Sequence, residues 1–269
     1  MLLDLLIAVF FLFVGLEITA TLSHPKQIVL PCVAALGGMV IPAGIFLSLN
    51  PDSPAWATAM PTDLALALGV FALLGKRANP AVRIFLLTLA VADDLFSLIV
   101  LAIFYGDKLD LVHSASTLGA AALGALLALI PKFPVSRLIS LLSPICNFFV
   151  IPVYVIAKLS QGISFESLTS STATSLIAAR VIGKILGITL FAWLAVKIKL
   201  THLPKDLRFS EIAGVGALAG MGLTVALVIS EVAIESEIVQ GEVKAGLIIS
   251  AVISGLIGYF WLKRSPALR

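Results

Sequence analysis

The chain has 269 residues, of which 60% are hydrophobic and 12% are charged, and its formal net charge is +3. This composition excludes a soluble globular domain, because apolar runs of the roughly 20 residues that cross a bilayer recur along the whole sequence. We therefore predict an all-α, polytopic membrane protein that forms a single transmembrane domain over residues 1–269.

About nine transmembrane helices are expected in chain order. They cover residues 2–21, 28–49, 58–75, 80–105, 113–131, 138–158, 174–198, 209–231 and 243–262. The first lacks a basic leader and a small-residue cleavage site, so we expect an uncleaved span. Basic residues mark the cytoplasmic side of such proteins. Apart from Arg180 and Lys184, which lie deep within a helix, only Lys108, Lys158 and Lys244 fall on the outer side when the N-terminus is outside, which predicts a cytoplasmic C-terminus.

Two of these helices are predicted to be broken. Pro61 lacks a backbone donor and disfavours helix at the residue before it. Thr62 or Asp63 would then cap a new helical segment. The helix at 209–231 carries a run of glycines before Thr224, which is a second predicted break: Gly214, Gly216, Gly220 and Gly222.

Each broken helix is the middle member of a three-helix group, residues 28–105 or 174–262. The groups begin at the second and seventh helices, so we expect opposite orientations in the bilayer. Interrupted helices at corresponding positions of inverted repeats indicate a binding site near the midplane. The alternative is that Pro and Gly only kink helices or allow close packing. The remaining helices, 2–21, 113–131 and 138–158, are expected to form a scaffold.

Asp93 and Asp94 lie side by side in the middle of the helix at 80–105. A carboxylate at this depth costs about 2.5–3.5 kcal/mol on insertion scales, so the pair indicates ion or proton transport. Burial and mutual repulsion favour protonation of such a pair, whereas a hard cation such as Na⁺ needs ionised oxygen ligands. Competition between a proton and Na⁺ is a sufficient basis for antiport. The alternative is a structural pair held by Lys184.

Further charged residues are candidate members of this site. Asp63 is expected to cap the second half-helix or to offset positive helix ends. Lys184 is expected to pair with Asp93 or to face a negative helix end, because a buried lysine needs a partner. Arg180 lies on the same helical face and either reaches the outer surface or adds a second cation beside the acids. Glu17 either lines an inner funnel or marks the membrane interface.

Several motifs together resemble the NhaA-type sodium/proton antiporters, a family that exemplifies transporters built from inverted repeats. The resemblance runs over nearly the whole chain. It is carried by FFLFVGLE at 10–17, ALGGM at 35–39, PTDLALALGV at 61–70, DDL at 93–95, IGK at 182–184 and LTHLP at 200–204.

The resemblance implies a fold with two crossed, broken helices, here shortened by three of the twelve family helices. It implies that Asp93 and Asp94 bind the cation and the proton, with Thr62 near the ion. Asp63 and Lys184 would balance the half-helix ends, and Lys184 would pair with Asp93. The implied activity is exchange of Na⁺ or Li⁺ for protons across the bacterial inner membrane by alternating access, which serves pH homeostasis. Enzyme activity, a cofactor and a nucleic-acid partner are not expected.

The chain departs from the family in its scaffold. The first family helix and the hairpin through which family dimers form have no counterpart, although a homodimer stays open. The chain also passes from Tyr105 to His113 by one short loop where the family has two helices. Thr21 stands where the family often has an acid, and Arg180 where an apolar residue is expected. The alternatives are a sodium-coupled organic-anion carrier of this architecture and a transport-inactive, reduced relative.

Overall fold

A computed structural model describes residues 2–22, 25–75, 78–108, 115–131, 133–160 and 166–265. Within these ranges the chain is helical and has no strand. Seven helices are long and apolar enough to cross a membrane, and one further helix pair forms a span bent by 51°. The predicted all-α, polytopic class is confirmed.

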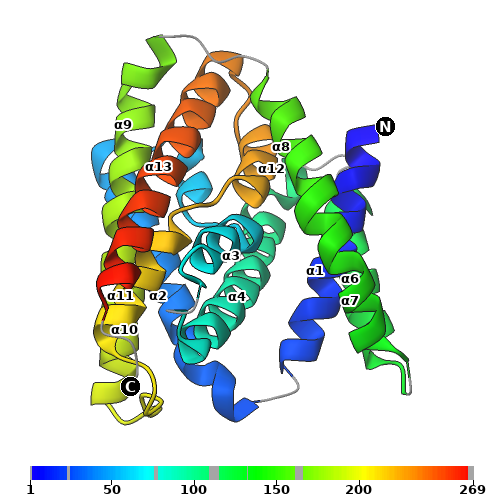
Figure 1. Ribbon diagram of the computed structural model, residues 1–269. Coiled ribbons are helices and arrows are strands. Elements are labelled where there is room, and N and C mark those ends of the chain that lie inside the picture. The colour runs from blue at the N-terminus through cyan, green and yellow to red at the C-terminus, as the bar shows by residue number, and fades with distance from the viewer. Residues whose placement is uncertain are drawn as a thin grey trace.

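The helices follow one another with short connections (Figure 1). The first half contains α1 (Leu2–Leu22), α2 (Pro25–Leu49), η1 (Pro54–Ala59), α3 (Leu64–Ala72), α4 (Pro80–Tyr105), η3 (Gly106–Lys108), η4 (Ala115–Gly119) and α6 (Ala120–Leu129). The second half contains α7 (Val135–Ile145), η5 (Cys146–Val150), α8 (Ile151–Leu159), η6 (Glu166–Thr169), α9 (Ser171–Ala178), η7 (Ala179–Gly183), α10 (Lys184–Lys197), α11 (Phe209–Ala219), α12 (Thr224–Ala233) and α13 (Glu237–Arg264). Three of these, η4, η5 and η7, are π-helical turns within longer helices.

The helix predicted at 113–131 corresponds to the shorter apolar helix Ser116–Leu129. Residues 109–114, including His113, lie outside the described residues, so the count of nine stays a prediction. The predicted orientation also stays a prediction, because several of the basic residues from which it was inferred are not described: Lys76, Arg77, Lys132 and Arg269.

Both breaks occur where the sequence predicts them. The first of the two broken spans is helical from Pro54 to Ala59, unwinds at 60–63, and resumes as α3 with Asp63 as its N-cap. This span begins four residues earlier than predicted, because Ser53 caps a 3₁₀ segment that precedes Pro61. The second span ends its first half at Ala219 and resumes at Thr224.

The two unwound centres contact each other directly. The Asp63 amide donates to the Met221 carbonyl at 3.1 Å, and the Thr62 hydroxyl donates to the Ala219 carbonyl at 3.0 Å. A methyl group on Gly222 would overlap the Pro61 carbonyl oxygen, so only glycine permits this approach. The carbonyls of Ala219 and Met221 at the second break are thus satisfied by the first break.

Corresponding helices of the two three-helix groups run in opposite directions. Gly37 of α2 packs against Gly187 of α10 so closely that a methyl group on either would overlap the other's carbonyl oxygen. Toward the end of α2, Ser171 at the start of α9 donates to Asn50 at 3.1 Å. These two contacts show that α2 is antiparallel to α9–α10.

The third helices of the groups, α4 and α13, are also antiparallel. Asn79 at the start of α4 donates to Glu211 at 3.0 Å, and Trp261 near the end of α13 donates to the Ser210 carbonyl at 2.9 Å. The start of α11 therefore lies beside the start of one helix and the end of the other. Tyr105, at the far end of α4, donates to the Pro54 carbonyl of η1 at 3.1 Å, so η1 and α11 start at opposite ends of the bundle.

Candidate functional site

The two adjacent acids of α4 have different surroundings. Asp93 and Asp94 are both buried, and Asp93 Oδ2 lies 3.1 Å from Lys184 Nζ. Asp94 instead faces a cavity. Consecutive helical residues point about 100° apart, which explains the divergence. The buried Oδ1 atoms of both acids have no hydrogen-bond partner among the described residues.

Lys184 connects the acid pair to the crossing of the broken spans. This fully buried residue donates to Asp93 Oδ2 at 3.1 Å and to Thr62 Oγ1 at 2.9 Å. Thr62 in turn donates to the carbonyl of Ala219. One chain of contacts therefore joins α4, α10 and both unwound centres.

Asp63 serves the N-terminal ends of two half-helices at once. Its Oδ1 accepts from the amides of Ala65 and Leu66 at 3.1 and 3.3 Å. Its Oδ2 accepts from the Thr224 hydroxyl at 2.5 Å and from the Thr224 amide at 3.4 Å. Both half-helices present their positive dipole ends to this carboxylate. Thr224 was not predicted from the sequence to make this contact, although it follows its break as Thr62 follows Pro61.

An enclosed cavity of about 10 Å³, room for about one water molecule, lies beside Asp94. Its polar lining comes from α1, the first break, α4, η5 and α12: Glu17, Thr62, Asp63, Asp94, Asn147 and Thr224. The described residues contain no group of three His, Cys, Asp or Glu at metal-ligating spacing, so the acids line the cavity without converging on one point. A cation beside Asp94 would take its other oxygen ligands from hydroxyls, the amide or water.

Glu17 and Asn147 place the scaffold helices at this cavity. Glu17, half-buried in α1, lies in the lining together with Asp94 rather than only at the membrane interface. Asn147 lies in the π-helical turn η5 and donates to Ser143 Oγ at 3.2 Å. Asn147 was not predicted from the sequence as a site residue; its signal was one amide side chain in an apolar helix. Such π-turns are frequent at functional sites.

The structure contradicts one of the two sequence-based interpretations of Arg180, that its side chain reaches the outer surface. The side chain is fully buried, so it does not reach the outer surface. Its guanidinium group donates to main-chain carbonyls of both unwound spans rather than to an acid. The sequence could not indicate these partners, because they come together only when the two spans cross.

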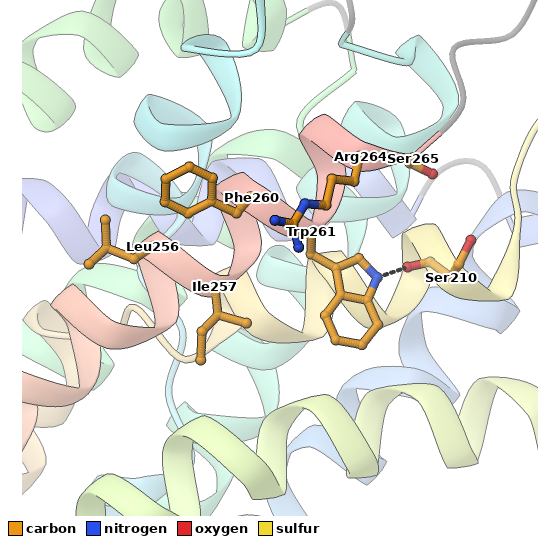
Figure 2. Close-up of a pocket in the computed structure, with 7 residues that line it drawn as sticks. All are labelled: Ser210, Leu256, Ile257, Phe260, Trp261, Arg264 and Ser265. Atoms are coloured by element: carbon orange, nitrogen blue, oxygen red, sulfur yellow. Dashed lines mark hydrogen bonds between the residues drawn. The ribbon is translucent and has the colours of Figure 1, made fainter.

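A wider groove of about 620 Å³ is separate from this site. Figure 2 shows it along α13 and beside the start of α11, where the Trp261 indole donates to the Ser210 carbonyl. Its lining shares no residue with the acidic cavity and contains no acid: Ser210, Leu256, Ile257, Phe260, Trp261, Arg264 and Ser265. The exposed apolar side chains suit a lipid-facing surface, so this groove is not the ion site.

Two interrupted membrane spans that cross beside buried acids and a buried lysine define a class, the secondary transporters with discontinuous helices. Comparison with known proteins gives the family. The family model described as Na+/H+ antiporter 1 matches residues 1–140 and 130–262. The chain belongs to this family, whose members are transporters rather than enzymes.

Curated relatives support the same assignment. The chain is 34% identical to the Na(+)/H(+) antiporter NhaA of Salmonella typhi, over 97% of this chain and 82% of the relative. The values are 33% for the NhaA of Salmonella arizonae and 34% for that of Escherichia coli O6:K15:H31, with the same coverage. These alignments span 318 positions, more than the 269 residues of the chain, so the relatives carry segments that this shortened member lacks.

Proposed function

We propose that this protein is a secondary active transporter that exchanges Na⁺, or Li⁺, for protons across the bacterial inner membrane. The observation that carries the proposal is the position of Asp94, which faces the cavity at the crossing of two broken spans. Membership of the Na+/H+ antiporter 1 family supports the choice of ions.

Of the three core acids, Asp94 has the contacts best suited to exchange of a proton for Na⁺. Asp93 is paired with Lys184, and Asp63 is held by the N-terminal ends of α3 and α12. Among the described residues, the buried Oδ1 of Asp94 has no such partner. A carboxylate in this position takes up either a proton or Na⁺, because either cation removes the cost of an uncompensated buried charge. Binding one therefore displaces the other, with Thr62 beside the ion.

Alternating access is the proposed mechanism of movement. We take 28–105 and 174–262 as two inverted groups, supported by the opposite directions of their corresponding helices. The cavity is lined from one side by the broken spans and from the other by α1 and η5. Movement of one side relative to the other would open the cavity to alternate faces of the membrane. We place the N-terminus outside and the C-terminus in the cytoplasm.

The size of the cavity argues against an organic-anion carrier. Sites for small organic molecules usually have volumes of roughly 300–1,000 Å³, whereas this cavity has about 10 Å³. In this conformation the space admits an ion or a proton but not an organic anion. Uptake of an organic anion driven by a sodium gradient would overturn this conclusion.

Proteoliposomes test the proposal directly. Purified protein should dissipate an imposed pH gradient when Na⁺ or Li⁺ is added, and Asp94→Asn should abolish this flux because the amide can neither bind nor release a proton. Glu237→Gln is a matched control, since Glu237 is an exposed acid at the start of α13. Absence of sodium-dependent flux in sealed vesicles at every pH from acid to alkaline would reject the proposal and favour a transport-inactive relative.

A further inference from the structure

We propose that Arg180 is a positioning residue that fastens the two unwound centres to each other. Its Nη1 donates to the Thr58 carbonyl at 2.6 Å, and its Nε donates to the Gly220 carbonyl at 3.3 Å. Its Nη2 donates to the carbonyls of Pro61 and Gly222 at 2.9 and 2.8 Å. Two acceptors belong to the first broken span and two to the second. One side chain of a third span, α9–α10, therefore binds both.

The chemistry of these acceptors explains why a cation lies here. Carbonyl groups at the end of a helix lack intrahelical partners and carry partial negative charge. Thr58 lies in the last turn of η1 and Pro61 follows its C-cap, whereas Gly220 and Gly222 follow the end of α11. Two negative ends therefore meet in a buried place, where unpaired carbonyls are costly. Arg180 satisfies both ends and offsets their charge.

Arginine suits this task better than lysine. A guanidinium group offers five N–H donors in a planar fork, and lysine offers three donors from one point. The four acceptors here are spread over two spans, so one ammonium group would reach only some of them. Lys184 binds Asp93 and Thr62 instead. In this chain the cation that holds the carbonyl ends and the cation that pairs with the acid are thus two residues, four positions apart.

Gly222 completes the arrangement. A methyl group at this position would overlap both Arg180 Nη2 and the Pro61 carbonyl oxygen. Gly222→Ala should therefore displace the guanidinium group without removing its charge. Gly69 of α3 is the matched control, because no atom lies within 4 Å of a methyl group placed there.

Hydrogen–deuterium exchange of the full-length protein in nanodiscs tests this proposal. Arg180→Lys and Gly222→Ala should speed amide exchange at residues 60–64 and 220–224 by at least about tenfold, since each lost bond to a charged donor weakens local closure. Exchange in α1 and α6 should stay unchanged, and Gly69→Ala should behave as wild type. Arg180→Met removes both the charge and the guanidinium donors. If this variant does not fold, Arg180→Lys and Gly222→Ala still test the proposal.

A second measurement separates positioning from packing. In proteoliposomes, Arg180→Lys should raise the KM for Na⁺ several-fold while Vmax changes less, because Thr62 and Asp63 lie in the segment that Arg180 holds. This part rests on the proposed antiport function, whereas the exchange measurement does not. Wild-type exchange at both segments in Arg180→Lys and Gly222→Ala would overturn the proposal. So would faster exchange spread evenly over all helices with an unchanged KM.

Discussion

At the scale of single residues, the pairing of Lys184 with Asp93 has a measurable consequence for stability. Both groups are buried and lie 3.1 Å apart. Removing one partner of a buried ion pair leaves an uncompensated charge, which typically costs about 3–5 kcal/mol. Lys184→Met should therefore lower the free energy of unfolding by roughly this amount, measured by thermal unfolding in detergent.

The double variant Lys184→Met with Asp93→Asn is the control for this prediction. It removes both charges, so it should regain most of the lost stability. Equal instability of the double and single variants would show that the lysine contributes through packing rather than through its charge.

The sequence could predict which acids belong to the site but not which basic side chain contacts each of them. Asp93, Asp94, Asp63 and Lys184 are recognisable because charged groups at bilayer depth are expensive. The structure places all four around the crossing of the broken spans. The role of Arg180 was not predictable, because the sequence does not show which main-chain carbonyls come close to its side chain in the fold. Asn147 was missed for a related reason: its position at the cavity depends on a π-turn.

At the scale of helices, Asp63 holds the starts of two half-helices. Loss of an N-cap side chain typically costs about 0.5–2 kcal/mol for each helix. Asp63→Ala should therefore destabilise the protein by about 1–4 kcal/mol, because both α3 and α12 lose their acceptor. Chemical or thermal unfolding in detergent measures this loss.

Asp63→Asn distinguishes capping from charge in the same experiment. Asparagine is as good an N-cap as aspartate but carries no charge to offset the helix ends. We expect a loss intermediate between wild type and alanine, because the amide has one acceptor oxygen whereas Asp63 uses two, one for α3 and one for Thr224 of α12. Equal losses in the two variants would mean that the negative charge, rather than the cap geometry, matters.

The helix breaks show how far local sequence determines structure here. Pro61 removes a donor and the glycines favour unwinding, so both interruptions were predictable. The contact between them was not, since it requires the two spans to cross. The π-helical turns η5 and η7 were also unpredicted.

At the scale of the whole molecule, N-terminus and C-terminus lie at opposite ends of the bundle (Figure 1). The predicted orientation follows from the charge pattern and can be tested by cysteine labelling. In a variant with Cys32 and Cys146 replaced by alanine, Glu237→Cys should react with a membrane-impermeant maleimide in intact cells. Lys205→Cys should react only after the cells are opened. Both positions are exposed, so the reverse pattern would invert the orientation.

The fold class was predictable because composition alone requires spanning helices, and the odd offset between the groups anticipated their opposite directions. The internal shortening relative to the family leaves the crossing of the broken spans intact. Two parts of the scaffold, α1 and η5–α8, still supply lining residues of the cavity.

That cavity has room for little more than one water molecule. A sodium ion that reaches Asp94 in this conformation must therefore leave most of its hydration shell behind. The selectivity of the site would then depend on how well the lining oxygens replace the lost waters. A larger alkali ion would bind more weakly, because the cavity would have to expand to admit it.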